Sequence, residues 1–215
     1  MSNPEDHVPD EVQQASLTPT ALDRALAAVE KRTRELAEHR RRTVLHFEAA
    51  LEMRLSLDHP LILCREQLVT LTVRLAQALN VTPDDIQGMV EGVRLRDLGL
   101  GSLPDMVVFS GKYRPDVAQA QYELHVKLGL ATIGTFLNRP GLEIAAAHHE
   151  RWDGSGYPSG LAGQHIPFTA RVFAAVESHV LMEHETSSGI AMSHLRNEAG
   201  SGLDPDVVGR LLELL

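Results

Sequence analysis

Histidine and carboxylate side chains recur between residues 97 and 177 in a pattern that could bind a metal ion. The set comprises Asp97, His125, the adjacent pair His148 and His149, and Glu177. Imidazole nitrogens and carboxylate oxygens are ligands that suit iron, manganese or zinc. The adjacent pair is weak evidence by itself, because neighbouring histidines also arise by chance or serve as hydrogen-bonding groups in a core. Metal binding and an ordinary structural role therefore both stay open at this point.

A glycine-rich loop follows the histidine pair. The stretch from residue 148 to 171 has the sequence HHERWDGSGYPSGLAGQHIPFTAR. Its glycines permit unusual backbone dihedrals, so backbone amides can turn toward a ligand. A plain turn between two helices is the alternative, but loops of this length inside a compact domain are commonly functional. The loop therefore strengthens the case for a binding site beside the histidines.

Helices must position these groups, because apolar residues recur at helical spacing and no stretch alternates convincingly as a strand does. The clearest start signal is Thr82-Pro83-Asp84-Asp85, which combines a capping residue, a proline and two acids. The sequence predicts an all-α fold with helices over approximately these ranges: 61–80, 82–97, 116–137, 141–150, 167–184 and 204–215.

The N-terminal part of the chain has a different pattern. Residues 1–17 are rich in acids and proline and are expected to be disordered. Residues 18–57, which open with Thr18 and Pro19, predict one long helix, a candidate coiled-coil or dimerisation element, and residues 58–215 form the remaining domain. The helix has a heptad seam, from which Val44, Leu51 and Leu55 depart. Two interpretations stay open: a coiled coil between two copies, and a helix packed along its own domain. The seam comprises Leu22, Leu26, Val29, Thr33, Leu36, Arg40, Thr43, Phe47, Ala50 and Arg54.

Composition excludes some classes of function. The chain has 215 residues, of which 43% are hydrophobic, enough to form a core. Its formal net charge of -9 argues against a surface groove for nucleic acid, although a local cation could still neutralise a small anionic ligand. Cys64 is the single cysteine, so no disulfide forms within the chain. With no long apolar run and a polar N-terminus, we expect a soluble, cytoplasmic protein without membrane contact.

Several motifs together resemble the HD-GYP family, a branch of the HD-domain metal-dependent phosphohydrolases. They are LRDLGLGSLPD at 95–105, a histidine at 125, the 148–171 stretch and AGSGLDPDVV at 199–208. The resemblance extends from about Leu61 to the end of the chain. It implies an all-helical bundle with a centre of two or three metal ions and bacterial cyclic di-GMP phosphodiesterase activity.

The family's functional positions are partly kept. The resemblance implies a metal-ligand set of Asp97, His125, His148, His149 and Glu177, the last standing where the family has aspartate; Asp97 would be catalytic in an active protein. It also implies a loop that contacts a ligand or a partner protein. The residues of this loop, with the arginine that follows it, are Asp153, Gly154, Gly156, Tyr157, Pro158 and Arg171. The resemblance further implies that this loop contacts diguanylate cyclase (GGDEF) domains.

Other family positions are replaced. The histidine of the HD pair is Arg96, and the lysine that closes this motif is Leu100. A metal-binding histidine in the first helix of the domain is Cys64, and a ligand glutamate four residues earlier is Pro60. A second aspartate after Glu177 is Val180, and a lysine before Gly111 is also lost.

These replacements indicate a degenerate member. Arginine cannot bind a metal ion and stays protonated, so Arg96 places a fixed cation beside Asp97, where it could neutralise a phosphate or pair with a carboxylate. We expect at most one divalent ion (iron, manganese or zinc), or none. The favoured role is a signalling domain without efficient hydrolysis, either a nucleotide sensor or an interaction module for GGDEF-type or other signalling proteins. The alternative is a cyclic di-GMP phosphodiesterase, or an enzyme for a related phosphoester, with a reduced metal centre.

Overall fold

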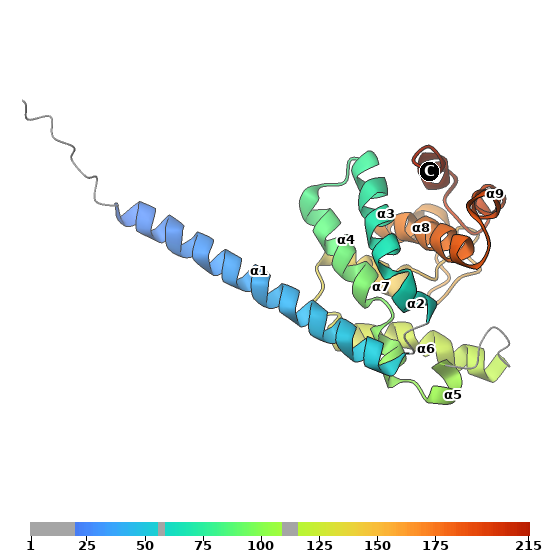
Figure 1. Ribbon diagram of the computed structural model, residues 1–215, viewed down its shortest axis with the longest axis horizontal. Helices are drawn as coiled ribbons and strands as arrows, with labels where there is room; N and C mark the ends of the chain where they lie inside the picture. The colour runs from blue at the N-terminus through green and yellow to red at the C-terminus, as the bar shows by residue number, and fades with distance from the viewer. Residues whose placement is uncertain (1–19, 56–58, 109–115) are drawn as a thin grey trace, which may run out of the picture. The chain divides into compact units, whose positions relative to one another are not determined.

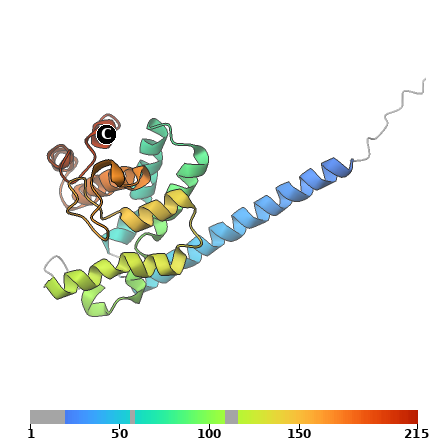
Figure 2. The same cartoon turned by 180° about the vertical axis from the view of Figure 1, so that it is seen from behind.

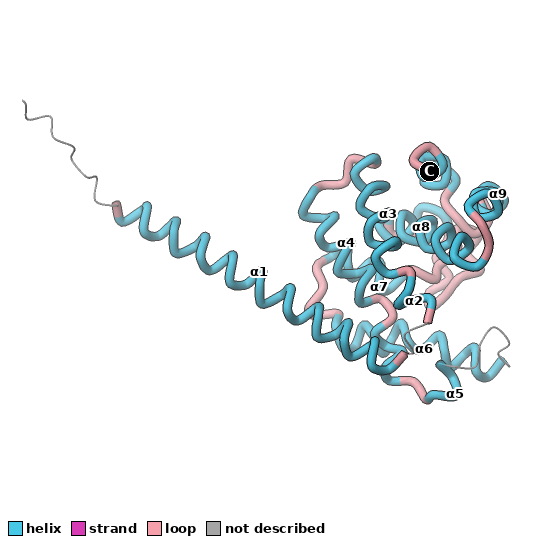
Figure 3. The backbone as a smooth tube through the Cα atoms, in the orientation of Figure 1, coloured by secondary structure: helices cyan, strands magenta, loops and turns pink. Residues whose placement is uncertain are grey.

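The structure, a computed structural model, describes residues 20–55, 59–108 and 116–215, with the backbone alone for residues 116–118. The chain divides into two compact units, residues 1–42 and residues 43–215. Every regular secondary-structure element in the described ranges is a helix, and Figure 3 shows no strand there. The predicted all-α class is therefore confirmed. Among the described helices, none is long and apolar enough to cross a bilayer.

The first unit contains most of helix α1 (Ala21–Arg54). Thr20 and Asp23 cap its start reciprocally. The Asp23 amide donates to the Thr20 hydroxyl oxygen at 3.1 Å, and the Thr20 amide donates to the Asp23 carboxylate at 2.8 Å. Side chains of residues 21–39 are all exposed. This part of the helix therefore has no packing partner among the described residues.

The second unit is built from the end of α1 and the helices that follow it (Figures 1 and 2). α4 packs against α3 and α7, α8 packs against α3, α7 and α9, and α6 lies beside α7. The largest apolar cluster joins residues of α3, α4, α8 and α10. In chain order the elements are α2 (Pro60–Leu63), α3 (Arg65–Ala78), α4 (Pro83–Leu95), η1 (Leu98–Ser102), α5 (Asp105–Val108), α6 (Asp116–Ile133), α7 (Arg139–Ala147), η2 (Gly163–His165), α8 (Phe168–Glu185), α9 (Ser188–Glu198) and α10 (Pro205–Leu212).

The last turns of α1 contribute to the core of the second unit. Val44, Leu51 and Leu55 are at most 6% exposed, and the latter two pack with Leu100 and Leu103. These three α1 residues are the ones that depart from the heptad seam. Their departure has a packing reason, because from Val44 onward the helix turns apolar side chains into its own domain.

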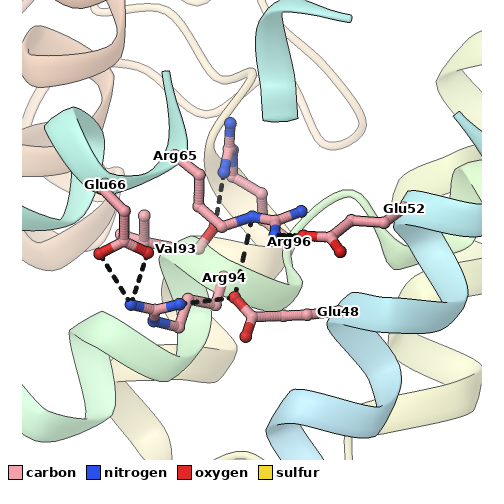
Figure 4. Close-up of polar contacts among 7 residues, drawn as sticks. All are labelled: Glu48, Glu52, Arg65, Glu66, Val93, Arg94 and Arg96. Atoms are coloured by element: carbon pink, nitrogen blue, oxygen red, sulfur yellow. Dashed lines mark hydrogen bonds and ion pairs between the residues drawn. The ribbon is translucent and has the colours of Figure 1, made fainter. Parts of the chain in front are cut away.

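A largely buried ion-pair network holds this end of α1 against α3 and α4 (Figure 4). Glu48, which is 5% exposed, accepts a hydrogen bond from Arg94 at 2.7 Å and lies 3.7 Å from Arg65. Arg94 also pairs with Glu66 at 2.9 Å, and Arg65 pairs with Glu52. A buried carboxylate needs such partners, because an unpaired charge in a core is strongly destabilising. The network therefore fixes α1 beside the two helices that lead to the candidate site.

Most predicted helices are present with shifted ends. Thr82 caps α4 as predicted, accepting a hydrogen bond from the Asp85 amide. The predicted helix over 61–80 is divided at Cys64 into α2 and α3. α7 ends at Ala147 instead of residue 150, so the histidine pair lies in the turn after the helix. Thr18, Pro19 and the expected disordered tail of residues 1–17 lie outside the described residues.

Helix α9 was missed in the sequence. Its segment, SGIAMSHLRNE, buries Ala191 and Leu195. Two buried positions leave too little apolar periodicity to distinguish a helix from a loop. The element α5 was also missed, because a single helical turn has no pattern of its own.

Candidate metal centre

Four candidate ligands meet in the second unit. Asp97 follows α4, His125 lies on α6, and His148 and His149 follow α7. One ligand atom from each residue lies within 4.8 Å of the others. Asp97 Oδ1 is 3.5 Å from His125 Nε2 and 3.6 Å from His148 Nε2, and these two nitrogens are 3.4 Å apart. Three imidazoles and one carboxylate thus converge on one point.

Backbone carbonyl groups orient two of the rings. His125 Nδ1 lies 2.7 Å from the Tyr122 carbonyl oxygen, and His148 Nδ1 lies 3.1 Å from that of Ile144. An Nδ1–H that donates to these oxygens leaves the Nε2 lone pair directed at the centre, the arrangement typical of metal-ligating histidine. His149 Nε2 is buried and has no hydrogen-bond partner among the described residues. Because a buried polar atom is costly without a partner, this orphaned nitrogen fits a metal ligand. The donor set suits one divalent ion.

Burial sets the protonation of the histidines. It lowers the pKa of His125, and it lowers the pKa of His149 well below the usual histidine value, with further lowering by the neighbouring His148. Both rings are therefore neutral near pH 7, the form that can bind a metal ion. Burial alone would raise the pKa of Asp97, but the Arg96 guanidinium, with His148 and His125, holds it well below its usual range. Asp97 is consequently a carboxylate under all ordinary conditions.

Arg96 bridges two carboxylates beside the cluster. Its Nε is 3.1 Å from Asp97 Oδ2, and its Nε and Nη2 are 3.0 and 2.9 Å from Glu177 Oε1. Nη1 donates to the Val93 carbonyl (Figure 4), and the guanidinium stacks over the Phe173 ring at 4.7 Å. Burial would lower the pKa of Arg96, but Asp97 and Glu177 raise it, so the charge is fixed. Glu177, predicted as a ligand, is thus held by Arg96 and lies outside the four-residue cluster.

The other replaced positions have structural surroundings. Cys64 is 1% exposed and Val180 is 2% exposed, both within the main apolar core. Leu100 is fully buried in the smaller core that α1 completes, where a lysine would bring a charged group into apolar packing. Pro60 begins α2. The position of the lost lysine before Gly111 lies outside the described residues, as does Gly111 itself.

A cavity of ≈ 620 Å³ opens in front of the histidines. Among the described residues its lining includes four glutamates and a single arginine, Arg151, which is paired with Glu198 at 2.9 Å. Tyr157 lines it too, and its ring stacks on His149 at a centroid distance of 4.5 Å. Two of the four lining glutamates are neutralised, Glu177 by Arg96 and Glu198 by Arg151, and no arginine or lysine of the described lining is left unpaired to meet an anion. The four glutamates are Glu123, Glu150, Glu177 and Glu198.

Two anchors hold the glycine-rich loop. The buried Glu150 carboxylate accepts hydrogen bonds from the amides of Ser159 at 2.8 Å and Leu161 at 2.9 Å. The Asp153 amide donates to the Ser201 carbonyl at 2.8 Å, which ties the loop to the segment before α10. Asp153 itself is exposed, and its carboxylate accepts from the Ser155 amide. Sequence analysis missed Glu150, although its place directly after the histidine pair could have suggested it.

The remaining predicted loop residues lie in different surroundings. Gly154 has a φ of +81°, which favours glycine, and Pro158 is half-buried beside Tyr157. Arg171 lies outside the cavity lining: it pairs with the buried Asp204 and donates to the Ile166 carbonyl at 3.0 Å. Its contacts therefore support a scaffolding role.

Replacing Gly156 with alanine is expected to lower the free energy of unfolding by about 2–3 kcal/mol. A Cβ at this position would lie 2.4 Å from the Arg151 amide nitrogen and 2.5 Å from the His149 carbonyl oxygen. Thermal unfolding measures the loss. The matched control is Gly189→Ala on α9, where a Cβ meets nothing within 4 Å and helix propensity should give a gain of up to about 1 kcal/mol. Equal melting temperatures for the two variants would contradict the close approach at Gly156.

Comparison with known proteins identifies the family. A family model described as "HD domain" matches residues 49–207, well over half of the chain. The chain belongs to the HD-domain family. This HD domain is 30% identical over 188 residues to the cyclic di-GMP phosphodiesterase response regulator RpfG of Xanthomonas campestris, covering 83% of this chain and 49% of the relative. It is 33% identical over 147 residues to a probable cyclic di-GMP phosphodiesterase of Vibrio cholerae, covering 61% of this chain and 33% of the relative.

Solved structures agree with the fold of the HD domain. A cyclic GMP-AMP-specific phosphodiesterase of Vibrio cholerae aligns with a TM-score of 0.61 at 15% identity, over 80% of this chain and 47% of that one. An HDG"Y"P protein of Bdellovibrio bacteriovorus aligns with a TM-score of 0.57 at 20% identity, over 68% and 49%. The chain thus spans about half the length, or less, of these relatives. The resemblance to the HD-GYP branch is confirmed by these matches.

Proposed function

We propose that the chain is a cytoplasmic HD-GYP-type signalling domain that binds at most one divalent metal ion and hydrolyses cyclic dinucleotides little or not at all. The observation that carries the proposal is the bridge from Arg96 to Asp97 and Glu177. The relatives named as cyclic di-GMP phosphodiesterases supply the ligand class, since they match most of the chain.

The ion pairs of Arg96 matter to metal binding because the two oxygens of Asp97 have different neighbours. Oδ1 faces the imidazoles of His125 and His148, whereas Oδ2 faces Arg96. A carboxylate that joins two metal ions uses one oxygen for each, and here a guanidinium nitrogen lies 3.1 Å from the second oxygen, as an ion pair without a hydrogen bond. A bound metal ion would supply Lewis-acid polarisation and a more acidic water. The chain keeps ligands for one such ion and holds a fixed cation where a second would be needed.

The cavity supports a non-catalytic role for a second reason. A cyclic dinucleotide carries two phosphates, yet the family's lysine position is the buried Leu100, and Arg171 is paired with Asp204. The one arginine of the described lining, Arg151, is already paired with Glu198. Nucleotide binding should therefore require a bound metal ion.

Two signalling roles follow, and each makes its own prediction. A nucleotide sensor needs the metal-loaded cavity, so metal removal should abolish cyclic di-GMP binding. An interaction module needs the surface of the glycine-rich loop, where Asp153 and Ser155 are exposed. Binding to a GGDEF-type domain should then survive metal removal and be lost when Asp153 is replaced by lysine.

Metal content and hydrolysis test the proposal together. The protein, purified anaerobically and supplied with Mn²⁺ or Fe²⁺, should retain no more than one equivalent of metal and form no linear product from cyclic di-GMP. Elemental analysis and chromatography of the nucleotide measure both, with an active relative such as RpfG as the positive control. Two retained equivalents, or linear product formed at a rate comparable to that of the positive control, would overturn the proposal.

A reduced phosphodiesterase is the second candidate. It is favoured by the intact cluster of three imidazoles and Asp97, with ligand atoms within 4.8 Å. In that case product formation should depend on metal and disappear in Asp97→Asn, while Asp105→Asn, an exposed carboxylate nearby in sequence, should leave it unchanged. Product that persists in Asp97→Asn would identify a contaminating enzyme.

A further inference from the structure

The first unit presents a narrow apolar seam to solvent. Leu22, Leu26, Val29 and Leu36 are 53–68% exposed. They alternate four and three residues apart, and Thr33 completes the rhythm. The positions between them carry charged residues and alanines. A stripe restricted to two positions in seven is the seam of a coiled coil, whereas a helix packed on a globular core has a wider apolar face.

We propose that residues 21–39 form a parallel, two-stranded coiled coil with a second copy of this chain, ending before Arg40, the next seam position, which would face its own copy across a parallel pair. A solitary helix of this length is marginal in water, because most helical stability in proteins comes from packing of an apolar face. Every side chain of residues 21–39 is exposed in the single copy. Another helix with the same seam is the partner that fills its heptad spacing. The proposal concerns the first unit and does not depend on the metal centre.

Charge decides the orientation of the two helices. In this register Asp23 and Glu30 flank the seam on one side and Arg32 flanks it on the other. In a parallel pair, each residue on the Arg32 side of the seam faces a residue on the other side of the seam in the second copy. That residue lies five positions later in the sequence. Arg32 then faces Ala37 of the second copy, and Glu30 faces Ala25. No like charges meet at these flanking positions, so a parallel pair carries no electrostatic cost there.

Antiparallel alignments that pair Leu26 with a leucine or valine of the second copy's seam bring like charges together. Pairing Leu26 with Val29 of the second copy places Asp23 opposite Glu30, and pairing Leu26 with Leu36 places Glu30 opposite Glu30 and Arg32 opposite Arg32. Such pairs are destabilising at coiled-coil flanks.

Oligomeric state of the whole chain tests the interface. The seam is short, so the dimer should dissociate on dilution, and sedimentation equilibrium over a concentration series should give a mass between one and two copies of 23.6 kDa. Val29→Glu should weaken the dimer by roughly a hundredfold, about 2.7 kcal/mol, because it places two carboxylates in the central layer. Ala28→Glu, one position off the seam, should leave the dissociation constant within about threefold. A single-copy mass at every concentration, or equal weakening by both variants, would overturn the proposal.

Disulfide trapping tests the orientation. In a parallel pair, residue 22 of each copy lies within disulfide reach, about 6 Å between Cα atoms, whereas antiparallel pairing separates them by roughly 20 Å. Oxidation of Leu22→Cys should therefore give a covalent dimer. Arg24→Cys, which points away from the seam, should not, and the native Cys64 is too deeply buried to compete at 1% exposure. A dimer that Leu22→Cys fails to trap would rule out the parallel arrangement.

Discussion

Replacing Arg96 with methionine is expected to lower the free energy of unfolding by about 3–5 kcal/mol. The change removes the cation from between Asp97 and Glu177, so that two carboxylates repel each other in a buried site. Asp97 is 4% exposed and cannot recover the lost interaction from water. Urea unfolding in the presence of a chelator, followed by circular dichroism, measures the loss.

The matched control is Arg139→Met. Arg139 also pairs with a carboxylate, Glu143 at 2.8 Å, but its side chain is 88% exposed. Exposed pairs four residues apart on a helix contribute little, so this variant should change the free energy of unfolding by less than about 0.5 kcal/mol. Similar losses in the two variants would mean that Arg96 is not the internal counterion of the site.

Arg96→His extends the same prediction to metal binding. An imidazole at this position frees Asp97 Oδ2 and Glu177 and adds one nitrogen ligand. We expect this variant to be less stable than the unmodified protein in chelator and to gain more stability from Mn²⁺, because ligand binding to the folded state alone raises its stability. If Mn²⁺ shifts the melting temperature of both proteins equally, Arg96 does not occupy a metal position.

Replacing Leu100 with lysine is expected to cost about 4 kcal/mol, because a fully buried lysine must give up its proton or its packing. Leu100 has no exposed surface and packs with Leu51, Leu55 and Leu103. Restoring the family's lysine should therefore destabilise the fold and should not restore phosphate binding. Thermal unfolding of the single variant measures the effect.

Ser102→Lys provides the comparison, since Ser102 is exposed two residues further along the same turn. It should leave the melting temperature within about 2 °C of the unmodified protein. A Leu100→Lys variant as stable as Ser102→Lys would show that this core can open toward the cavity. The double variant Arg96→His with Leu100→Lys is consequently expected to bind less metal than Arg96→His alone.

The helical fold and the ligand cluster were both accessible from the sequence. Apolar periodicity located α3, α4 and α8, and the family motifs brought Asp97, His125 and His148 into one candidate site. Helix ends were less accessible, because α7 stops at Ala147 through its tertiary contacts while the local pattern would allow it to continue. The contacts of single side chains depend on packing between distant segments. Arg96 was recognised as a cation, but its simultaneous hold on Asp97 and Glu177 required the structure.

The same limit applies to Leu100 and Arg171. Both occupy family positions that a motif comparison describes as functional, yet one completes an apolar core and the other supports the chain before α10. A motif records which residue stands at a position, and it does not record what that residue touches. Substitution at one position can therefore change the role of another without any change in its identity.

The burial of Val44, Leu51 and Leu55 has a consequence for where the domain can be cut. A protein that starts at residue 58, or at residue 49 where the family match begins, would lack Val44 and with it part of the surface that covers Leu95 and Ile133. Either start would also remove Glu48, leaving Arg65 and Arg94 without their shared carboxylate. Truncation at Thr43 instead removes only the exposed turns. Gene fusions and domain exchanges that start at Thr43 should transfer a whole folding unit.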